Sequence, residues 1–368
     1  MKHTFLLSAL LALAQAGPVN HSHELQKRSS CTITTSNLSE IASIKKSCTS
    51  IVVDGVTVPA GETLDLTGLQ TGTTVTFEGT TSFGYSSWEG PLIFVSGSAV
   101  TVTGASGHVL EGNGAKWWDG LGSNGGVTKP TFFFAHFMDE GSVIKNLNIH
   151  NTPAEVFSIY GSHELTIDSV TIDDSDGDSE GGHNTDGFDI ASSSSITIQD
   201  SIIKNQDDCV AIDSGSKIQF LNNHCSGGHG ISIGGVGGTS DNSVNGATLS
   251  GNTVTNSVIG LRVKTLSGAT GRVKNVGFKN NQISNISQYG ITIEGDYENS
   301  GPTGVATGGV PITGLTVTGV TGSVDSGAQP IYILVENASD WSFSDIDITG
   351  GSYSKKCSGI PSGAGVSC

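Results

Sequence analysis

DGFDI (186–190), DCVAI (208–212) and HGISI (229–233) are three segments of this chain that align without a gap. Each begins with an ionisable residue and continues with apolar residues at alternate positions. Their starts lie 22 and 21 residues apart, which is about one coil of a solenoid. IGLRV (259–263) and YGITI (289–293) fit the same frame. We therefore predict strands that stack on successive coils about 4.8 Å apart.

Strand-like runs continue on both sides of these segments and are separated by Gly and Asn. Their recurrence, every ~20 to 30 residues, is the pattern of a parallel β-helix. The alternative is an antiparallel sandwich, whose strands recur every ~8 to 12 residues with frequent hairpin turns, and no hairpin signal dominates here. The sequence predicts an all-β solenoid. Apolar residues at helical spacing between Asn37 and Lys46 add a short N-terminal helix that caps the first coil, with Asn37 and Glu40 resembling a capping box.

The alignment also predicts which way each side chain points. The third and fifth positions of the segments form two interior columns, and the fourth position faces outward. Asp186, Asp208 and His229 then share one outer column, with Arg262 near its end. Acids, an imidazole and a cation converge on one face of the predicted solenoid.

The N-terminal region is predicted to be removed in two steps. Residues 1–16 have a basic start, an apolar run and an Ala-Gln-Ala ending, which is typical of a secretory signal peptide. Residues 17–28 are polar and end in the dibasic pair Lys27-Arg28, which indicates a pro-segment, although a disordered mature terminus is the alternative. Residues 29–368 are predicted to form a single catalytic domain. We expect a secreted, extracellular protein with no membrane span.

The charge of the chain excludes one class of partner. The formal net charge is −17 at pH 7, whereas nucleic-acid binding requires a basic surface. No nucleic-acid partner is expected. If the substrate is itself an anion, its site must be a local cluster of cations.

Six cysteines in a secreted chain indicate disulfides. Fifteen full pairings are open to six cysteines, and these six fall into three local couples: Cys31–Cys48, Cys209–Cys225 and Cys357–Cys368. A zinc site is the competing interpretation, but the spacing does not fit one. Asn37, Asn285 and Asn337 stand in N-x-S/T sequons and are candidates for glycosylation.

The outer face carries the groups that glycoside hydrolysis needs. That reaction uses a protonated acid and a second carboxylate that activates water or attacks directly. Asp186, Asp207 and Asp208 supply three carboxyls, and crowding raises the pKa of at least one of them. His229 can orient a carboxyl. Arg262 and Lys264 can pair with the carboxylate of a sugar acid.

Four short blocks resemble the signature motifs of the polygalacturonase family, glycoside hydrolase family 28, in order and spacing. They are NTDGFD (184–189), QDDC (206–209), GHG (228–230) and RVK (262–264). DYEN (296–299) is similar to the family's substrate-binding tyrosine region. Similarity to fungal endopolygalacturonases extends over essentially the whole of residues 29–368. One departure is Val263, where the family usually has Ile.

The resemblance implies a right-handed parallel β-helix that hydrolyses α-1,4 bonds of polygalacturonate, the homogalacturonan of pectin, with inversion. It implies that Asp207 is the general acid and that Asp186 and Asp208 activate water, supported by His229. Residues implied to bind substrate are Asn184, Arg262, Lys264 and Tyr297. It implies no cofactor and no metal, a monomer, and inhibitor proteins of plant cell walls as partners.

Three rival functions remain open at this stage. A calcium-dependent pectate lyase is also a β-helix, but its chemistry requires bound calcium and a strong base. A secreted β-helical adhesin or glycan-binding module would not depend on Asp207. Hydrolysis of rhamnogalacturonan or xylogalacturonan would keep the mechanism and change the substrate.

Overall fold

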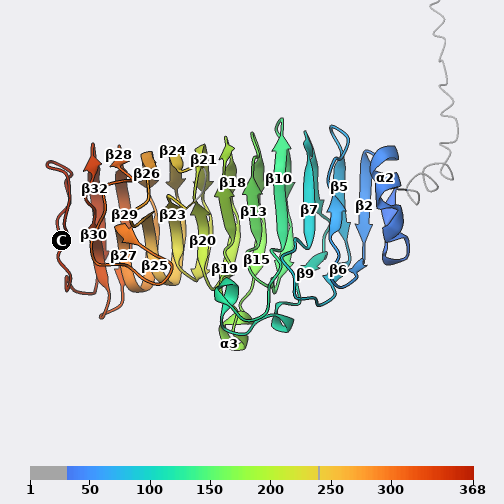
Figure 1. The fold of residues 1–368 in the computed structure, drawn as a ribbon, viewed down its shortest axis with the longest axis horizontal. Helices are drawn as coiled ribbons and strands as arrows, with labels where there is room; N and C mark the ends of the chain where they lie inside the picture. The colour runs from blue at the N-terminus through green and yellow to red at the C-terminus, as the bar shows by residue number, and fades with distance from the viewer. Residues whose placement is uncertain (1–30, 239–240) are drawn as a thin grey trace, which may run out of the picture.

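A computed structural model describes residues 31–238 and 241–368, and it is a right-handed parallel β-helix (Figure 1). The predicted signal peptide, pro-segment and mature N-terminus lie outside the described residues. Every strand pair with an assigned register is parallel, as expected when each coil returns to the same face of the solenoid. The predicted fold class is confirmed, and the sandwich alternative is excluded.

The strands form three rows that run along the helix axis, here called rows A, B and C. Row A, which carries the aligned segments, contains β4 (Leu64–Leu66), β7 (Ile93–Ser98), β10 (Phe133–Asp139), β13 (Phe157–Tyr160), β16 (Phe188–Ala191), β20 (Asp208–Ile212), β23 (Gly230–Val236), the C-terminal parts of β25 (Thr253–Leu266) and β27 (Gln282–Tyr297), and β30 (Gln329–Leu334).

Row B contains β1 (Thr32–Ile33), β2 (Ser50–Asp54), β5 (Thr74–Glu78), β8 (Thr101–Gly104), β11 (Val143–Lys145), β14 (Thr166–Asp168), β18 (Thr197–Gln199), β21 (Gly215–Leu221), β24 (Ser243–Ser250), β26 (Arg272–Lys279), β29 (Thr316–Val324) and β32 (Ser342–Thr349). Row C contains β3 (Thr57–Val58), β6 (Thr80–Phe83), β9 (Val109–Glu111), β12 (Asn148–His150), β15 (Thr171–Asp173), β19 (Ile202–Asn205), β22 (His224–Gly227) and the N-terminal parts of β25 and β27. Three short strands complete the coils: β17 (Ser193–Ser194), β28 (Ile312–Thr313) and β31 (Ala338–Ser339).

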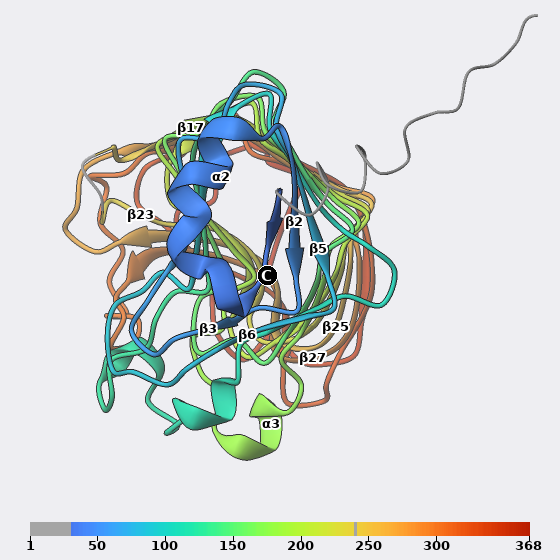
Figure 2. The same cartoon turned by 90° about the vertical axis from the view of Figure 1, so that its right-hand side faces the viewer.

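The helices are few and lie at the N-terminal end and in the loops before row A. The 3-10 helix η1 (Thr35–Glu40) and α2 (Ile41–Ser47) cross the open end of the first coil (Figure 2), so the predicted capping helix is confirmed. Its cap differs from the prediction, because Thr34 is the N-cap and its backbone N–H donates to Oδ1 of Asn37 (2.7 Å). The loop helices are η2 (Gly114–Lys116), η3 (Gly122–Asn124) and α3 (Gly177–Glu180). In residues 31–238 and 241–368, no helix has the length and apolar character that a membrane span needs.

The two predicted interior columns of row A lie in the core, together with buried side chains of rows B and C. Val210, Ile231, Leu261 and Ile291 pair in sequence across successive strands, and the second column pairs in the same way: Ile190, Ile212, Ile233, Val263 and Ile293. All of these side chains are buried. Because a one-residue slip would turn every apolar side chain outward, this burial holds the register of the outer columns as well.

The three local disulfides are confirmed. Cys31–Cys48 and Cys357–Cys368 join residues near the two ends of the described chain, and Cys209–Cys225 joins β20 to β22. Their Cα atoms lie 5.8–5.9 Å apart, inside the range that a disulfide requires.

Asp174 lies in the turn after β15. Its ionisation is expected to make the stability of the fold depend on pH. Its carboxylate accepts hydrogen bonds from the backbone N–H (2.7 Å) and the hydroxyl (2.6 Å) of Thr152. Burial nevertheless raises the pKa of Asp174 to about 7. An acid with a raised folded-state pKa stabilises the fold below its unfolded-state pKa, and that contribution is lost as the pH rises toward the folded value.

We therefore expect the free energy of unfolding to fall between pH 4 and pH 7, and Asp174→Asn to remove on the order of 2–4 kcal/mol of that fall. The neutral amide occupies the same space and needs no ionisation. Denaturant unfolding at both pH values measures the effect, with Asp176→Asn, an exposed residue of the same turn, as the matched control. A variant with the parent's pH slope would contradict this prediction.

Candidate active site

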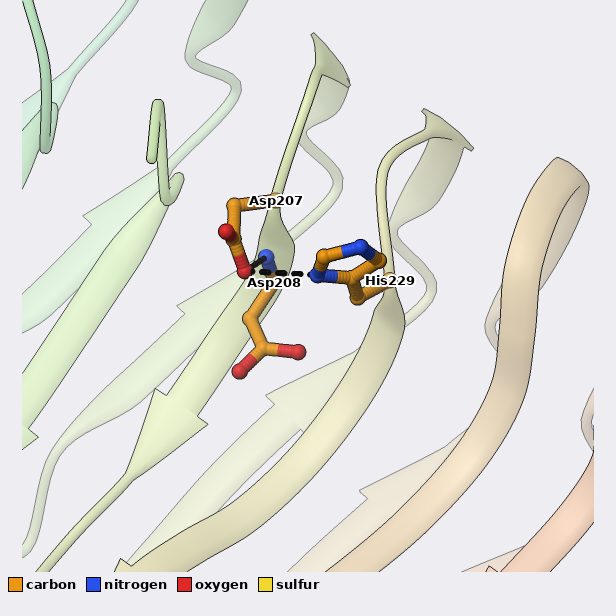
Figure 3. A group of neighbouring side chains, drawn as sticks. All are labelled: Asp207, Asp208 and His229. Atoms are coloured by element: carbon orange, nitrogen blue, oxygen red, sulfur yellow. Dashed lines mark hydrogen bonds and ion pairs between the residues drawn. The ribbon is translucent and has the colours of Figure 1, made fainter. Parts of the chain in front are cut away.

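Three of the predicted residues meet where β20 and β23 begin (Figure 3). Asp207 ends the turn before β20, Asp208 is the first residue of β20, and His229 precedes β23. The Nδ1–H of His229 donates to Oδ1 of Asp207 (2.8 Å), which also accepts the backbone N–H of Asp208 (2.8 Å). One carboxyl oxygen of Asp207 is therefore committed to two donors.

The predicted column of Asp186, Asp208 and His229 is wrong at its last member. Asp208 pairs with Gly230, and the register shifts between Asp208 and Val210. This bulge places His229 opposite Asp207, to whose carbonyl it also donates its backbone N–H (2.9 Å). A bulge adds one residue to one strand and re-aims the neighbouring side chains, which is how Asp207 comes to contact the imidazole.

The glycines that flank His229 are required for this approach. Gly228 and Gly230 have φ angles of +56° and +76°. A Cβ atom at Gly228 would lie 2.0 Å from the Asp207 carbonyl oxygen, and one at Gly230 would lie 2.2 Å from that of Ile259. Only glycine fits at both positions, because it adopts positive φ without strain and has no Cβ.

Asp208 is held as a buried ion pair. Its Oδ2 lies 2.6 Å from Nζ of Lys264, and its Oδ1 accepts the hydroxyl of Ser232 (2.6 Å). The side chains of Asp208 and Lys264 are 1% and 10% exposed. Burial acts to lower the pKa of Lys264, but the neighbouring Asp208 carboxylate outweighs burial and raises it.

Arg262 lies beside Lys264 and has an acidic partner of its own. Its Nε and Nη2 lie 2.8 and 2.7 Å from Oε2 of Glu294. The ring of Tyr297 lies 4.9 Å from the Arg262 guanidinium carbon and 5.0 Å from the Lys264 ammonium. These distances allow cation–π attraction. The two predicted cations and the predicted tyrosine therefore form one group.

Asn184 connects Asp207 to the loop before β10 by hydrogen bonds. Its Nδ2 donates to Oδ2 of Asp207 (3.0 Å), and its Oδ1 accepts the backbone N–H of Ser123 (3.1 Å). Its φ of +52° is a conformation that Asn tolerates better than most residues. Both oxygens of Asp207 are thus oriented, one by Asn184 and the other by His229.

The predicted crowding of carboxyls raises the pKa of Asp186 rather than that of Asp207. Burial and the charge of Asp207 hold the pKa of Asp186 well above its usual range. Burial also acts to raise the pKa of Asp207, but its hydrogen bond and ion pair with His229 outweigh burial and lower it. The same bond raises the pKa of His229 against its burial. In the free site a proton is therefore favoured on Asp186 and on His229.

One atom each of Asp207, Asp208 and His229 lie within 4.8 Å of one another, which is close enough to hold a metal ion. Each of these side chains has at least one polar atom with a partner in the protein. The His229 nitrogen binds Asp207, and Asp208 is neutralised by Lys264. The carboxylates of Asp207 and Asp208 are already paired with hydrogen-bond donors and with Lys264. In a metal site, such oxygens would be free to bind the ion.

Two residues were missed as site residues. Glu294 pairs in register with Lys264, so the outward column that singled out Lys264 would also have found it. Asp189 lies in the predicted outer position between Ser158 and Ala211, and burial with the charge of Glu155 holds its pKa well above the usual range. Both residues could have been predicted from their outward-facing positions in the strand register.

Comparisons with known proteins identify the family of this chain. The model of glycosyl hydrolases family 28 matches residues 48–368. A polygalacturonase of Saccharomyces cerevisiae is 57% identical over 100% of this chain and 99% of its own length, and endopolygalacturonase 1 of Colletotrichum lindemuthianum is 50% identical over 100% of both.

Solved structures show the same fold. Endopolygalacturonase I of Stereum purpureum, solved in complex with two galacturonate molecules, superposes with a TM-score of 0.78 at 36% identity over 87% of this chain and 95% of that one. Endo-xylogalacturonan hydrolase of Aspergillus tubingensis, with a TM-score of 0.74 at 24% identity over 92% of this chain and 98% of its own, shares the fold. With its full-length relatives and its cluster of aspartates, histidine and paired cations on a β-helix, this chain belongs to glycosyl hydrolases family 28.

Proposed function

We propose that this protein is a secreted endopolygalacturonase that hydrolyses the α-1,4-galacturonosyl bonds of polygalacturonate with inversion. The observation that carries the proposal is the placement of the Asp207–His229 pair beside the cations Arg262 and Lys264 in one row of strands. Relatives at 50–57% identity over the full chain are named polygalacturonase and endopolygalacturonase 1.

The cation group explains why the substrate should be a sugar acid. Arg262 and Lys264 are positive charges in a chain whose net charge is −17. The ring of Tyr297 borders both cations and is proposed to contact the sugar ring. A bound galacturonate carboxylate would share these cations with Glu294 and Asp208. This favours polygalacturonate over a neutral glycan, which would gain nothing from the cations.

Asp207 is proposed as the general acid, and substrate binding supplies the reason that it becomes protonated. The charge of Lys264 is one of the causes that lower the pKa of Asp207 in the free site. A substrate carboxylate bound to the cations would offset that charge and add a like charge nearby, and both effects raise the pKa of a carboxyl. The proton on His229 lies on the 2.8 Å hydrogen bond to Asp207 and is the nearest source.

Asp208 and Asp186 are proposed to activate the attacking water. Asp208 lies 2.6 Å from the Lys264 ammonium, and an inverting reaction needs one ionised carboxylate as general base. The charge of Asp207 is one cause that raises the pKa of Asp186. When Asp207 takes up a proton, that effect is lost, and Asp186 releases its own proton more readily. Asn184 is proposed to hold Asp207 toward the glycosidic oxygen.

We also propose the processing, oligomeric state and partners that the sequence predicts. They are a signal peptide at 1–16, a pro-segment at 17–28, a single catalytic domain at 29–368, a monomeric state, and inhibitor proteins of plant cell walls as partners. Among the sequons, Asn37 is the least suited to carry a glycan. Its side-chain nitrogen donates to the Thr32 carbonyl (2.9 Å), and its oxygen caps the helix.

The test is incubation of the protein with polygalacturonate in excess chelator at mildly acidic pH. We expect reducing ends without unsaturated products, because hydrolysis adds water across the bond. An early fall in viscosity per bond cut would indicate internal cleavage. Unsaturated, ultraviolet-absorbing products, or activity only after calcium is restored, would overturn the proposal and indicate a lyase.

A further inference from the structure

A cluster of aromatic side chains lies on row A toward the N-terminal end of the β-helix. Its members are Phe94 on β7, Phe134, His136 and Phe137 on β10, and Tyr160 on β13, here called the aromatic platform. Neighbouring ring centroids lie 4.1–6.2 Å apart. Phe137 and Tyr160 are 55% and 43% exposed, which is unusual for large apolar side chains that have neighbours to pack against.

The platform is continuous with the catalytic face. Phe94 pairs with Phe134, Phe134 with Ser158, Ser158 with Asp189, and Asp189 with Ala211 of β20. At about 4.8 Å per strand, Phe134 lies ~14 Å along the axis from the β20 level. The strands β7, β10, β13 and β20 follow one another along the long axis (Figure 1). A polysaccharide that lies along row A would reach both places.

A local break in β10 exposes the platform. The pairing of β10 with β7 shifts between Ala135 and Met138, and Phe137 in that bulge has a φ of +54°. The Phe137 ring lies over Gly161, where a Cβ atom would be 2.7 Å from the ring. A non-glycine residue with positive φ is uncommon. The backbone therefore departs from the regular strand at Phe137, the most exposed ring of the platform.

Unlike the group of Arg262 and Lys264, the aromatic platform carries no positive charge. Strands β7, β10 and β13 contain no Lys or Arg. Lys45 pairs with Asp65 (3.2 Å), which lies opposite Phe94 on the neighbouring strand β4, and Lys129 pairs with Asp119 (2.8 Å). Burial lowers the pKa of His136 to about 4, so its ring is neutral at mildly acidic pH. Its Nε2 lies 2.9 Å from the Ser158 hydroxyl.

We propose that the aromatic platform is a binding site for uncharged sugar units of the substrate chain, and specifically for methyl-esterified galacturonate. This inference rests on the proposed function. Aromatic faces attract the C–H surface of a pyranose by dispersion and area burial. They carry negative quadrupole density, and a carboxylate desolvated against them without a cation would be penalised. A methyl ester removes the charge and adds apolar surface.

The test compares kcat/KM on partially methyl-esterified homogalacturonan with kcat/KM on fully de-esterified polygalacturonate. The combined variant Phe137→Gly/Tyr160→Ser removes the two exposed rings, and glycine accepts the positive φ of Phe137 without strain. We expect the esterified-to-unesterified ratio to fall about fivefold, the effect typical of losing aromatic contacts. Ile202→Ala, at another exposed apolar residue but in row C, is the matched control and should keep the parent ratio.

A second variant keeps the test independent of how well the first one folds. Tyr160→Lys places a cation in the platform and should lower the same ratio by improving contact with unesterified units. An unchanged ratio in both variants would overturn this inference. So would a concentration-dependent dimer in light scattering that the variants abolish while the ratio stays constant, because the platform would then bind a second copy of the chain.

The parent protein separates failure of this inference from failure of the proposed function. A parent that releases no reducing ends from de-esterified polygalacturonate would contradict the proposed function itself. A parent that is active there, with variants that keep its ratio, would contradict the aromatic platform alone.

Discussion

Asp207→Asn is expected to lower kcat on polygalacturonate by about 10³-fold or more, since a general acid typically contributes 10²–10⁴-fold. The amide has nearly the same shape and can still accept the hydrogen bonds from Asp208 and His229 that Asp207 accepts. It cannot protonate a leaving oxygen. KM should change little, because the cation group that is proposed to bind the substrate carboxylate remains. Initial rates of reducing-end release at saturating substrate measure the effect.

The matched control is Asp200→Asn, an exposed aspartate whose φ of +51° also suits asparagine. It should retain the parent rate. Circular dichroism and thermal unfolding of both variants would establish that the fold is kept. A rate for Asp207→Asn within tenfold of the parent would remove Asp207 from the chemistry, and intact glycan binding with no turnover in either protein would favour the adhesin alternative.

Lys264→Met is expected to have the second largest effect, on both stability and activity. It leaves the Asp208 carboxylate, 1% exposed, with the Ser232 hydroxyl as its remaining side-chain partner. Removing one member of a buried ion pair typically costs about 3–5 kcal/mol, because the other charge stays buried without compensation. We expect a loss of that size in the free energy of unfolding. We also expect kcat/KM to fall by about 10²-fold, since a proposed base loses its orienting cation and a proposed substrate contact is lost.

A double-mutant cycle separates these two effects. Lys264→Met/Asp208→Asn removes both charges, so it should recover much of the stability while activity stays low. Lys274→Met, at an exposed lysine on β26, is the control for loss of a cation from this acidic chain. If Lys264→Met unfolds at the parent's denaturant midpoint, the ion pair does not hold Asp208 and its proposed role would be withdrawn.

The repeat could be predicted from the sequence because each coil of the β-helix is set by residues that are close in the chain or lie on the next coil. Alternating apolar residues at a spacing of 21 and 22 residues set the strand, the coil length and the outward position of Arg262. Local cysteine spacing likewise predicted all three disulfides. Each of these features depends on near neighbours in the chain or on the next coil, where a fixed period suffices to place one residue over another.

The partners within the site depended on the tertiary structure. A bulge of a single residue moved His229 from the level of Asp208 to that of Asp207, and the alignment contained no gap to signal it. Of Asp186 and Asp207, Asp186 has the raised pKa, because burial and the charge of Asp207 act on it through space while the hydrogen bond from His229 lowers the pKa of Asp207. The sequence by itself determined which side chains gather on the outer face of row A. Only the folded backbone decided which of them touch, because hydrogen bonds and ionisation respond to shifts far smaller than the coil period.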